Sequence, residues 1–200
     1  MIGELAQILY KVGCIKVGEF RLTSGALSPI YVDLKILPSF PEEFRRVIRL
    51  AVRRLREKDF HAICGLAVGG IPLATAIAYE MGKPLVYIRK ERKGHGTERL
   101  LEGHVEEGSK IMLVDDVSTT GGTLARGVKV LRDCGFEIEE AFVIVDREQG
   151  ARETLGKLEV NLDYLASLSQ IVDYLFFTGL MPRSYYNKIM SYLREVRASV

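Results

Sequence analysis

Two hundred residues with 28 Lys and Arg against 26 Asp and Glu give the chain a net charge of only +2, and 48% of its residues are hydrophobic. These proportions are typical of one globular domain with a real core, and they argue against overall disorder. A net charge this small gives no reason to expect nucleic-acid binding.

Neither a membrane segment nor an exported, disulfide-bonded protein is expected. Charges or glycines interrupt every apolar run well before the ~18 residues that a membrane span needs. Residues 1–11 lack the basic start, apolar centre and small-residue cleavage site of a signal peptide. The three cysteines, Cys14, Cys64 and Cys134, are far apart, which predicts free buried thiols rather than a disulfide framework or a zinc site. We therefore expect a cytoplasmic protein.

In chain order, the hydrophobic pattern alternates between helical and strand periods. Residues 2–12 predict a short helix, 30–34 a strand, and Pro41 opens a long helix. Residues 89–109 are expected to form a polar loop that contains glycines, whereas 158–166 are ambiguous between strand and helix. The other predicted strands are 62–66, 84–88, 110–114 and 141–145, and the other predicted helices are 72–80, 122–133, 169–178 and 184–197.

Strands separated by helices indicate an α/β fold with a mainly parallel sheet and helices on both faces. No internal repeat or low-complexity tract interrupts the pattern. We expect a single domain over residues 1–200, with the C-terminal helices of residues 168–198 packed on it rather than forming a second domain.

The most informative run covers residues 111–123. Four apolar residues predict a buried strand that ends at two carboxylates, Asp115 and Asp116, and open α/β sheets bind ligands at that edge. Gly121 and Gly122 let the backbone approach an anion, and the N-terminus of the following helix favours a phosphate. Because ionised carboxylates only accept hydrogen bonds, the aspartates are expected to face ribose hydroxyls. The predicted hydroxyl donors to the phosphate are Ser118, Thr119, Thr120 and Thr123.

Simpler interpretations account for less of this run. A lone Gly-Gly pair would favour a capped helix after a strand, but the whole run of residue types favours a ligand site. The run lacks the G-x-x-x-x-G-K-[ST] pattern of a P-loop, and it does not match the dinucleotide fingerprint.

Residues 111–123, with Val117 after the two acids, closely resemble the phosphoribosyl pyrophosphate (PRPP) motif of the type I phosphoribosyltransferases. Within that family the resemblance to the orotate phosphoribosyltransferases is closer still, and it extends from about Gly18 to Gly150. Four further segments carry the resemblance, and their combination makes it specific. These segments are FRLTSG (20–25) with SPIYVD (28–33), GLAVGGIP (65–72), RKERKGHG (89–96) and VDR (145–147).

The resemblance implies a type I phosphoribosyltransferase fold in which residues 1–40 form a small hood and 89–109 a mobile catalytic loop. Cations of this loop would offset the charge on departing pyrophosphate and help to exclude water. In the family some of them act in the neighbouring subunit's site, which implies a homodimer. From the residues alone, 65–72 could equally be a tight turn without a ligand, and 89–109 a solvated basic loop. The residues implied to bind pyrophosphate are Ala67, Val68, Gly69 and Gly70, together with Arg89, Lys90, Lys93 and His95.

Base recognition is implied at two positions. Arg147 matches the arginine that grips the pyrimidine, and Thr119 matches a residue that contacts the same base. A guanidinium suits a carboxylate because it binds it with two hydrogen bonds. The alternative for Arg147 is a salt bridge with Asp146 or Glu148.

The sequence departs from the family pattern at Thr23, where many members carry lysine. Threonine cannot supply that positive charge, so Lys35 or Arg21 would have to replace it through space. Tyr31 matches an aromatic position near the base. Base recognition by the N-terminal segment is therefore less closely defined than the PRPP site.

The activity implied by the resemblance is transfer of the 5-phosphoribosyl group from PRPP to orotate, which gives orotidine 5′-monophosphate and pyrophosphate in pyrimidine biosynthesis. Lys93, His95, Asp115 and Asp116 are the implied catalytic residues. The resemblance also implies a need for Mg²⁺, which takes oxygen ligands and is expected to be held mainly by PRPP, with no dedicated protein ligands.

Two alternatives use the same fold. Transfer to a purine base is disfavoured by Arg147, since orotate carries a carboxylate. A PRPP-sensing transcriptional regulator should carry an added DNA-binding helix-turn-helix, for which the short N-terminal helix leaves no room. We therefore expect small-molecule substrates and no nucleic-acid or membrane partner.

Overall fold

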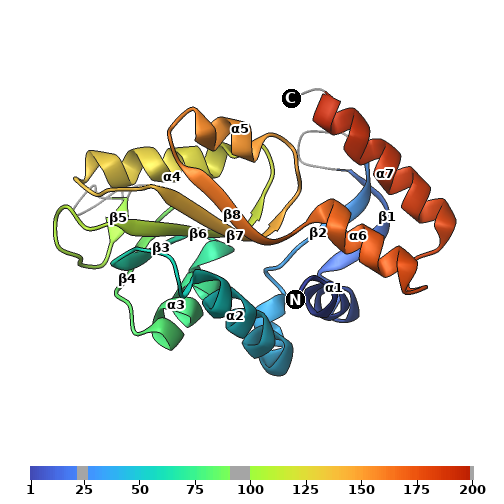
Figure 1. The fold of residues 1–200 in the computed structure, drawn as a ribbon, viewed down its shortest axis with the longest axis horizontal. Helices are drawn as coiled ribbons and strands as arrows, with labels where there is room; N and C mark the ends of the chain where they lie inside the picture. The colour runs from blue at the N-terminus through green and yellow to red at the C-terminus, as the bar shows by residue number, and fades with distance from the viewer. Residues whose placement is uncertain (22–26, 91–99, 199–200) are drawn as a thin grey trace.

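The computed structural model describes residues 1–21, 27–90 and 100–198, and within these a six-stranded sheet forms the centre. Its strands are β3 (Ala62–Leu66), β4 (Leu85–Ile88), β5 (Leu101–Glu102), β6 (Ile111–Ser118), β7 (Glu140–Asp146) and β8 (Asn161–Ser167). In space they follow the order β5-β4-β3-β6-β7-β8 (Figure 1). All neighbours are parallel except β5, which pairs antiparallel with β4. This mainly parallel sheet confirms the predicted α/β class.

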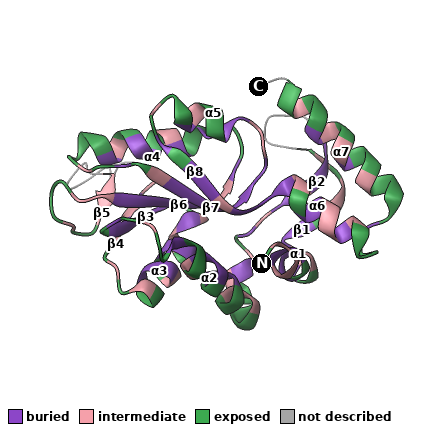
Figure 2. Cartoon of the chain, viewed as in Figure 1, coloured by how far each residue is buried: buried purple, intermediate pink, exposed green. Residues whose placement is uncertain are grey.

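Helices cover both faces of the sheet. They are α2 (Pro41–Leu55) and α3 (Gly70–Met81) on one face, with the 3₁₀ turn η1 (Leu37–Ser39) before α2, and α4 (Gly122–Asp133) and α5 (Ala151–Gly156) on the other (Figure 1). The central strands are continuous apolar runs because both of their faces are buried. In β7, Phe142 joins the core beneath α2 and α3, whereas Val143 joins the core beneath α4 and α5. Figure 2 shows the buried residues concentrated along these strands.

A smaller unit stands beside the main sheet, at the right in Figure 1. Its centre is the antiparallel pair β1 (Ile15–Arg21) and β2 (Leu27–Val32), which α1 (Ile2–Lys11) precedes. The chain returns there at its other end, where α6 (Leu168–Phe177) packs on α1 and α7 (Arg183–Ala198) lies along β2. The first and last parts of the described chain are thus built into one unit.

Most predicted elements are confirmed. The helix expected at 122–133 has the bounds of α4, and the ambiguous stretch 158–166 contains all of β8 except its last residue. None of the helices in the described ranges is both long and apolar enough to cross a membrane.

Several details differ from the predictions. β6 continues to Ser118 instead of ending at residue 114, because its last residues still pair with β7. The loop expected at 89–109 contains β5. β1 was not predicted because Gly18 and a register shift after Val17 interrupt its alternation, and α5 because six residues are too few to show a helical period. The expectation of a buried thiol was wrong for Cys134, which is exposed.

Candidate active site

The turn predicted to hold a phosphate lies between β6 and α4. Gly121 has a φ of +82°, and a Cβ there would lie 2.9 Å from the Cα of Ala151, so the turn requires glycine. The turn is also fixed from α5, because the Thr154 hydroxyl donates a hydrogen bond to the Thr120 carbonyl oxygen at 2.7 Å. Within the described chain no side chain caps the N-terminus of α4, so its first N–H groups can bind an anion.

The hydroxyl residues of this turn divide into two groups. Thr119, Thr120 and Thr123 are exposed, whereas Ser118 is buried. The Ser118 hydroxyl donates a hydrogen bond to Asp146 Oδ1 at 2.8 Å. The structure therefore places the three threonines beside the start of α4, while Ser118 joins the ends of β6 and β7.

Asp115 and Asp116 lie in the second half of β6, with their carboxylates held by the backbone of the strand. Asp115 Oδ1 accepts a hydrogen bond from the N–H of Asp116, and Asp116 Oδ1 accepts one from the N–H of Val117, both at 2.9 Å. Burial raises the pKa of Asp115 well above its ordinary value, and the charge of Asp116 raises it further. Burial also raises the pKa of Asp116, against the effect of the Lys35 ammonium. Such a pair favours a ligand whose hydroxyl groups donate hydrogen bonds to the carboxylates, or a ligand that develops positive charge.

The segment predicted to line the pyrophosphate packs directly on these acids. A Cβ on Gly69 would collide with the Asp116 carboxylate, and a Cβ on Gly70 would lie 2.6 Å from the Val114 carbonyl oxygen. The Ala67-Val68 peptide bond in the same segment is cis. The segment and the acidic pair therefore form one surface, at the carboxyl edge of β3 and β6.

We expect Gly70→Ala to weaken both folding and PRPP binding. The added methyl group would meet backbone, which cannot move aside as a flexible side chain can, so the free energy of unfolding should fall by about 1–3 kcal/mol. The KM for PRPP should rise. Urea unfolding and initial-rate kinetics measure the two effects. Gly156→Ala is the matched control because nothing lies within 4 Å of a Cβ there, and equal effects of the two changes would contradict the prediction.

Arg147 follows β7, and its backbone N–H donates a hydrogen bond to the Ser118 carbonyl oxygen at 3.0 Å. This contact brings the two predicted base-binding residues, Thr119 and Arg147, to one place. The Arg147 side chain is only 6% exposed, and burial lowers the pKa of its guanidinium. Its Nε and Nη2 atoms have no hydrogen-bond partner in the structure as described. The salt bridge considered as an alternative does not form among the described side chains, since Asp146 accepts from Ser118 and Glu148 reaches the C-terminal helices.

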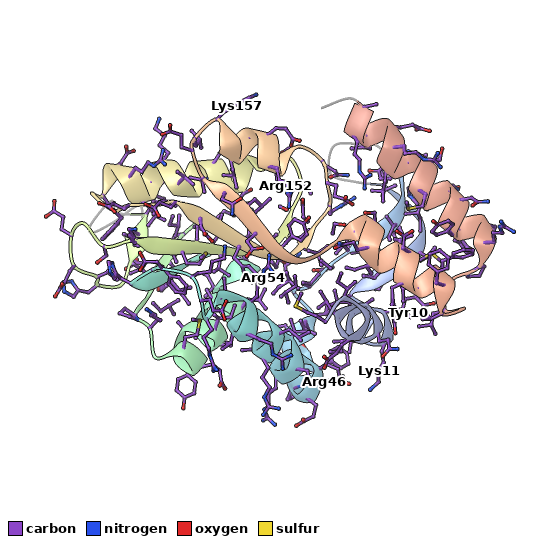
Figure 3. The ribbon with its side chains drawn as sticks, in the orientation of Figure 1. Tyr10, Lys11, Arg46, Arg54, Arg152 and Lys157 are labelled. Atoms are coloured by element: carbon purple, nitrogen blue, oxygen red, sulfur yellow. The ribbon has the colours of Figure 1, made fainter. Side chains whose placement is uncertain are left out.

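Arg54 shows how the Nε–Nη2 edge of a guanidinium binds a carboxylate elsewhere in this fold. It extends from α2 (Figure 3), and its Nε and Nη2 atoms donate to the Asp163 carboxylate at 2.8 to 3.1 Å. This side of a guanidinium binds a carboxylate through two parallel hydrogen bonds. Arg147 presents that edge without a protein partner, so a ligand carboxylate would complete it.

The predicted cationic residues lie only partly within the described chain. Arg89 follows β4, where its N–H donates to the Leu100 carbonyl oxygen and its Nη1 atom lies 3.4 Å from Glu102 Oε1. Lys90 is exposed. Lys93 and His95, like Thr23, fall outside the described residues, so their roles stay predictions.

Lys35 adds a positive charge that acts on Asp116. Its Nζ atom lies 2.8 Å from Asp33 Oδ1. The hydrogen bond to Asp33 raises the pKa of the ammonium, and the charge of Asp116 adds to that effect. The sequence suggested Lys35 only as a replacement for a charge missing at residue 23. Lys35 lies between β2 and η1, far along the chain from Asp116, so its electrostatic effect on that carboxylate has no local sequence signal.

Comparison with known proteins agrees with this geometry. Residues 34–161 match the family model described as a phosphoribosyl transferase domain. An orotate phosphoribosyltransferase from Sulfurisphaera tokodaii is 44% identical over 177 residues, which are 88% of this chain and 90% of that protein. The chain belongs to the orotate phosphoribosyltransferase family.

Solved structures of orotate phosphoribosyltransferases and related proteins share the fold. The crystal structure of the Aeropyrum pernix orotate phosphoribosyltransferase has a TM-score of 0.75 and 34% identity, over 86% of this chain and 99% of that one. The structure of Leishmania donovani UMP synthase has a TM-score of 0.88 and 32% identity, over 96% of this chain. The present chain spans 42% of that UMP synthase chain. These matches confirm the predicted type I phosphoribosyltransferase fold and the enzyme class.

Proposed function

We propose that the chain transfers the 5-phosphoribosyl group from PRPP to N1 of orotate, releasing pyrophosphate and forming orotidine 5′-monophosphate for pyrimidine biosynthesis. The observation that supports orotate as the base is the Nε–Nη2 edge of Arg147, buried and without a protein partner beside Thr119. Orotate carries the carboxylate that such an edge binds.

The sugar and its 5′-phosphate are assigned to the turn after β6. Backbone N–H groups at the start of α4 and the hydroxyls of Thr119, Thr120 and Thr123 hold the phosphate. Asp115 and Asp116 accept hydrogen bonds from the ribose hydroxyls. Because the bond to pyrophosphate breaks ahead of attack by the base, the ribose gains positive charge, which these carboxylates stabilise. Holding both substrates at one sheet edge supplies much of the acceleration.

The departing pyrophosphate is assigned to residues 67–70 and to the cations Arg89, Lys90, Lys93 and His95. We expect Lys93→Ala to reduce kcat by about 10²-fold or more, since it removes a charge that counts most in the transition state. Thermal unfolding should be unchanged. Lys129→Ala, which removes an exposed lysine from α4, is the control, and normal turnover by Lys93→Ala would exclude the loop from the mechanism.

Magnesium fits this assignment as a companion of PRPP. Asp115 is buried and Asp116 half-buried, and when both are ionised the single ammonium of Lys35 leaves negative charge that a cation next to the ribose would offset. The proposal assigns the ligands of the ion mainly to oxygens of PRPP, because Mg²⁺ takes oxygen ligands and keeps waters. When bound, Mg²⁺ neutralises the charge that develops on pyrophosphate.

We further propose a homodimer that shares the catalytic loop, a hood formed by residues 1–40, and a cytoplasmic location. Dimer and hood follow from the family resemblance, and the separate sheet of β1 and β2 suits a hood. The location is supported by unpaired cysteines, of which Cys14 is buried with a pKa raised by that burial to about 12. Sedimentation at graded concentrations tests the dimer.

One assay tests the proposed reaction. The protein is mixed with Mg²⁺ and PRPP, and consumption of orotate, uracil, adenine or hypoxanthine is followed separately. Turnover of orotate alone is the expected result. Product from a purine only would overturn the substrate, and absence of turnover with all four bases would overturn the activity.

A further inference from the structure

Glu148, the residue after Arg147, has its carboxylate bound to both C-terminal helices. Its Oε2 atom accepts a hydrogen bond from the N–H of Ser169 at 3.0 Å, and its Oε1 atom accepts one from the Ser169 hydroxyl at 3.1 Å. Ser169 lies in the first turn of α6, where backbone N–H groups have no partner within the helix. Arg197, near the end of α7, pairs with the same Oε1 atom at 2.7 Å. One carboxylate therefore links the segment after β7 to α6 and α7.

The backbone of Glu148 has a conformation that glutamate does not favour. Its φ is +59°, in the left-handed region that few residues other than glycine adopt. Such a conformation persists where surrounding contacts determine it, and it is found often at functional sites. The donors on Ser169 and Arg197 supply contacts of this kind. The path of the chain immediately after Arg147 is thus set by α6 and α7.

The backbone of Arg147 is fixed from the other side by the end of β6. Its N–H donates to the Ser118 carbonyl oxygen at 3.0 Å. The Ser118 hydroxyl and the N–H of Glu148 both donate to Asp146 Oδ1, at 2.8 and 3.1 Å. In the described chain the Nε and Nη2 atoms of Arg147 have no hydrogen-bond partner. The direction of that edge therefore depends on the backbone that carries the side chain and on the packing around its buried stem.

We propose that Glu148 is a positioning residue, which binds α6 and α7 and so fixes the backbone of Arg147 with the Nε–Nη2 edge toward the carboxylate of the base. The proposal rests on orotate being the base. It gives the C-terminal helices a part in substrate selection, through Ser169 and Arg197. An arginine whose backbone is fixed before the ligand arrives loses less conformational freedom on binding, which sharpens discrimination between bases with and without a carboxylate.

The test uses two nucleotides that differ only in the carboxylate, orotidine 5′-monophosphate and uridine 5′-monophosphate. Calorimetric titration gives the Kd of each, and the ratio of the two Kd values measures what the carboxylate contributes. Glu148→Ala removes the acceptor of all three donors, so we expect the ratio to fall about tenfold, while the affinity for uridine 5′-monophosphate and the KM for PRPP are retained. Glu148→Gln keeps an oxygen that can accept from Ser169, so it should keep most of the ratio.

A second set of variants tests the contact from α7. Arg197→Gln should lower the ratio by only about two- to threefold, because a partly exposed ion pair contributes little. Combined with Glu148→Ala, it should lower the ratio no further, since both changes remove the same pair. Arg194→Gln, which removes another exposed arginine from α7, is the control and should keep the wild-type ratio.

The outcomes separate the inference from the proposed function. If the wild type binds both nucleotides equally, the orotate assignment fails. If the wild type discriminates and Glu148→Ala discriminates equally well, or loses affinity for both nucleotides alike, the positioning role fails alone. Should Glu148→Ala fold poorly, Arg197→Gln decides, because it changes one exposed side chain. An unchanged ratio in that variant would then overturn the positioning role.

Discussion

Arg147→Gln should lower kcat/KM for orotate by about 10²- to 10³-fold, because it removes a buried charge that holds the substrate carboxylate through two hydrogen bonds. The KM for PRPP should change little, since PRPP is bound by the turn after β6 and by residues 67–70. Steady-state kinetics with each substrate varied in turn separates the two effects. A rise in the KM for PRPP equal to the loss for orotate would contradict the assignment of Arg147 to the base.

Two matched variants refine this result. Arg147→Lys keeps the charge but not the planar fork, so it should recover only a small part of the activity. Arg54→Gln removes the same kind of edge from a pair that is already complete, and it leaves the buried Asp163 carboxylate without its main partner. It should cost about 1–2 kcal/mol of stability with little effect on catalysis, whereas Arg147→Gln should not destabilise the free protein because Nε and Nη2 have no partners to lose.

The turn after β6 and the apolar strands are the features that the sequence alone predicts. The geometry of the turn at 118–123 is encoded in consecutive residues: Gly121 has a positive φ, and the following helix begins with N–H groups that no side chain among the described residues caps. A contiguous run of this kind can be interpreted without knowing the rest of the fold. The alternation of apolar runs likewise defines the sheet, because a strand buried on both faces must be apolar throughout.

What the sequence left open depends on contacts between distant segments. The closeness of Gly69 to the Asp116 carboxylate follows from the pairing of β3 with β6 and not from spacing in the chain. Lys35, which acts electrostatically on the same carboxylate, comes from the segment between β2 and η1, outside that sheet. β6 extended past its predicted end because pairing with β7 continues through Ser118. In each case tertiary packing decides, and local propensity carries no information about it.

Asp115→Asn should make the free protein more stable and nearly inactive. Burial and the charge of Asp116 raise the pKa of Asp115, so ionisation of this carboxyl opposes folding. Between its ordinary value of 3.8 and the raised native pKa, the native state binds the proton more tightly, and stability is therefore lost as the pH rises. Asparagine removes that loss and keeps an oxygen for the Asp116 N–H, so the melting temperature at neutral pH should rise by roughly a few degrees. Turnover should fall by about 10²-fold or more because a carboxylate facing the ribose is gone.

Asp163→Asn supplies the opposite case at similar burial. Asp163 and Asp115 are 6% and 8% exposed. Burial would raise the pKa of Asp163, but the hydrogen bonds from Arg54 outweigh it and lower that pKa. Ionisation of Asp163 thus supports folding, and this contribution is lost as the pH falls. Asp163→Asn should therefore lower the melting temperature at neutral pH and leave turnover largely intact.

Melting curves from about pH 4 to pH 8 compare the wild type with the two variants. The rise in melting temperature of Asp115→Asn over the wild type should shrink as the pH falls. A melting temperature lowered equally by both substitutions would contradict the prediction, because contacts in the free protein would then compensate the charge of Asp115.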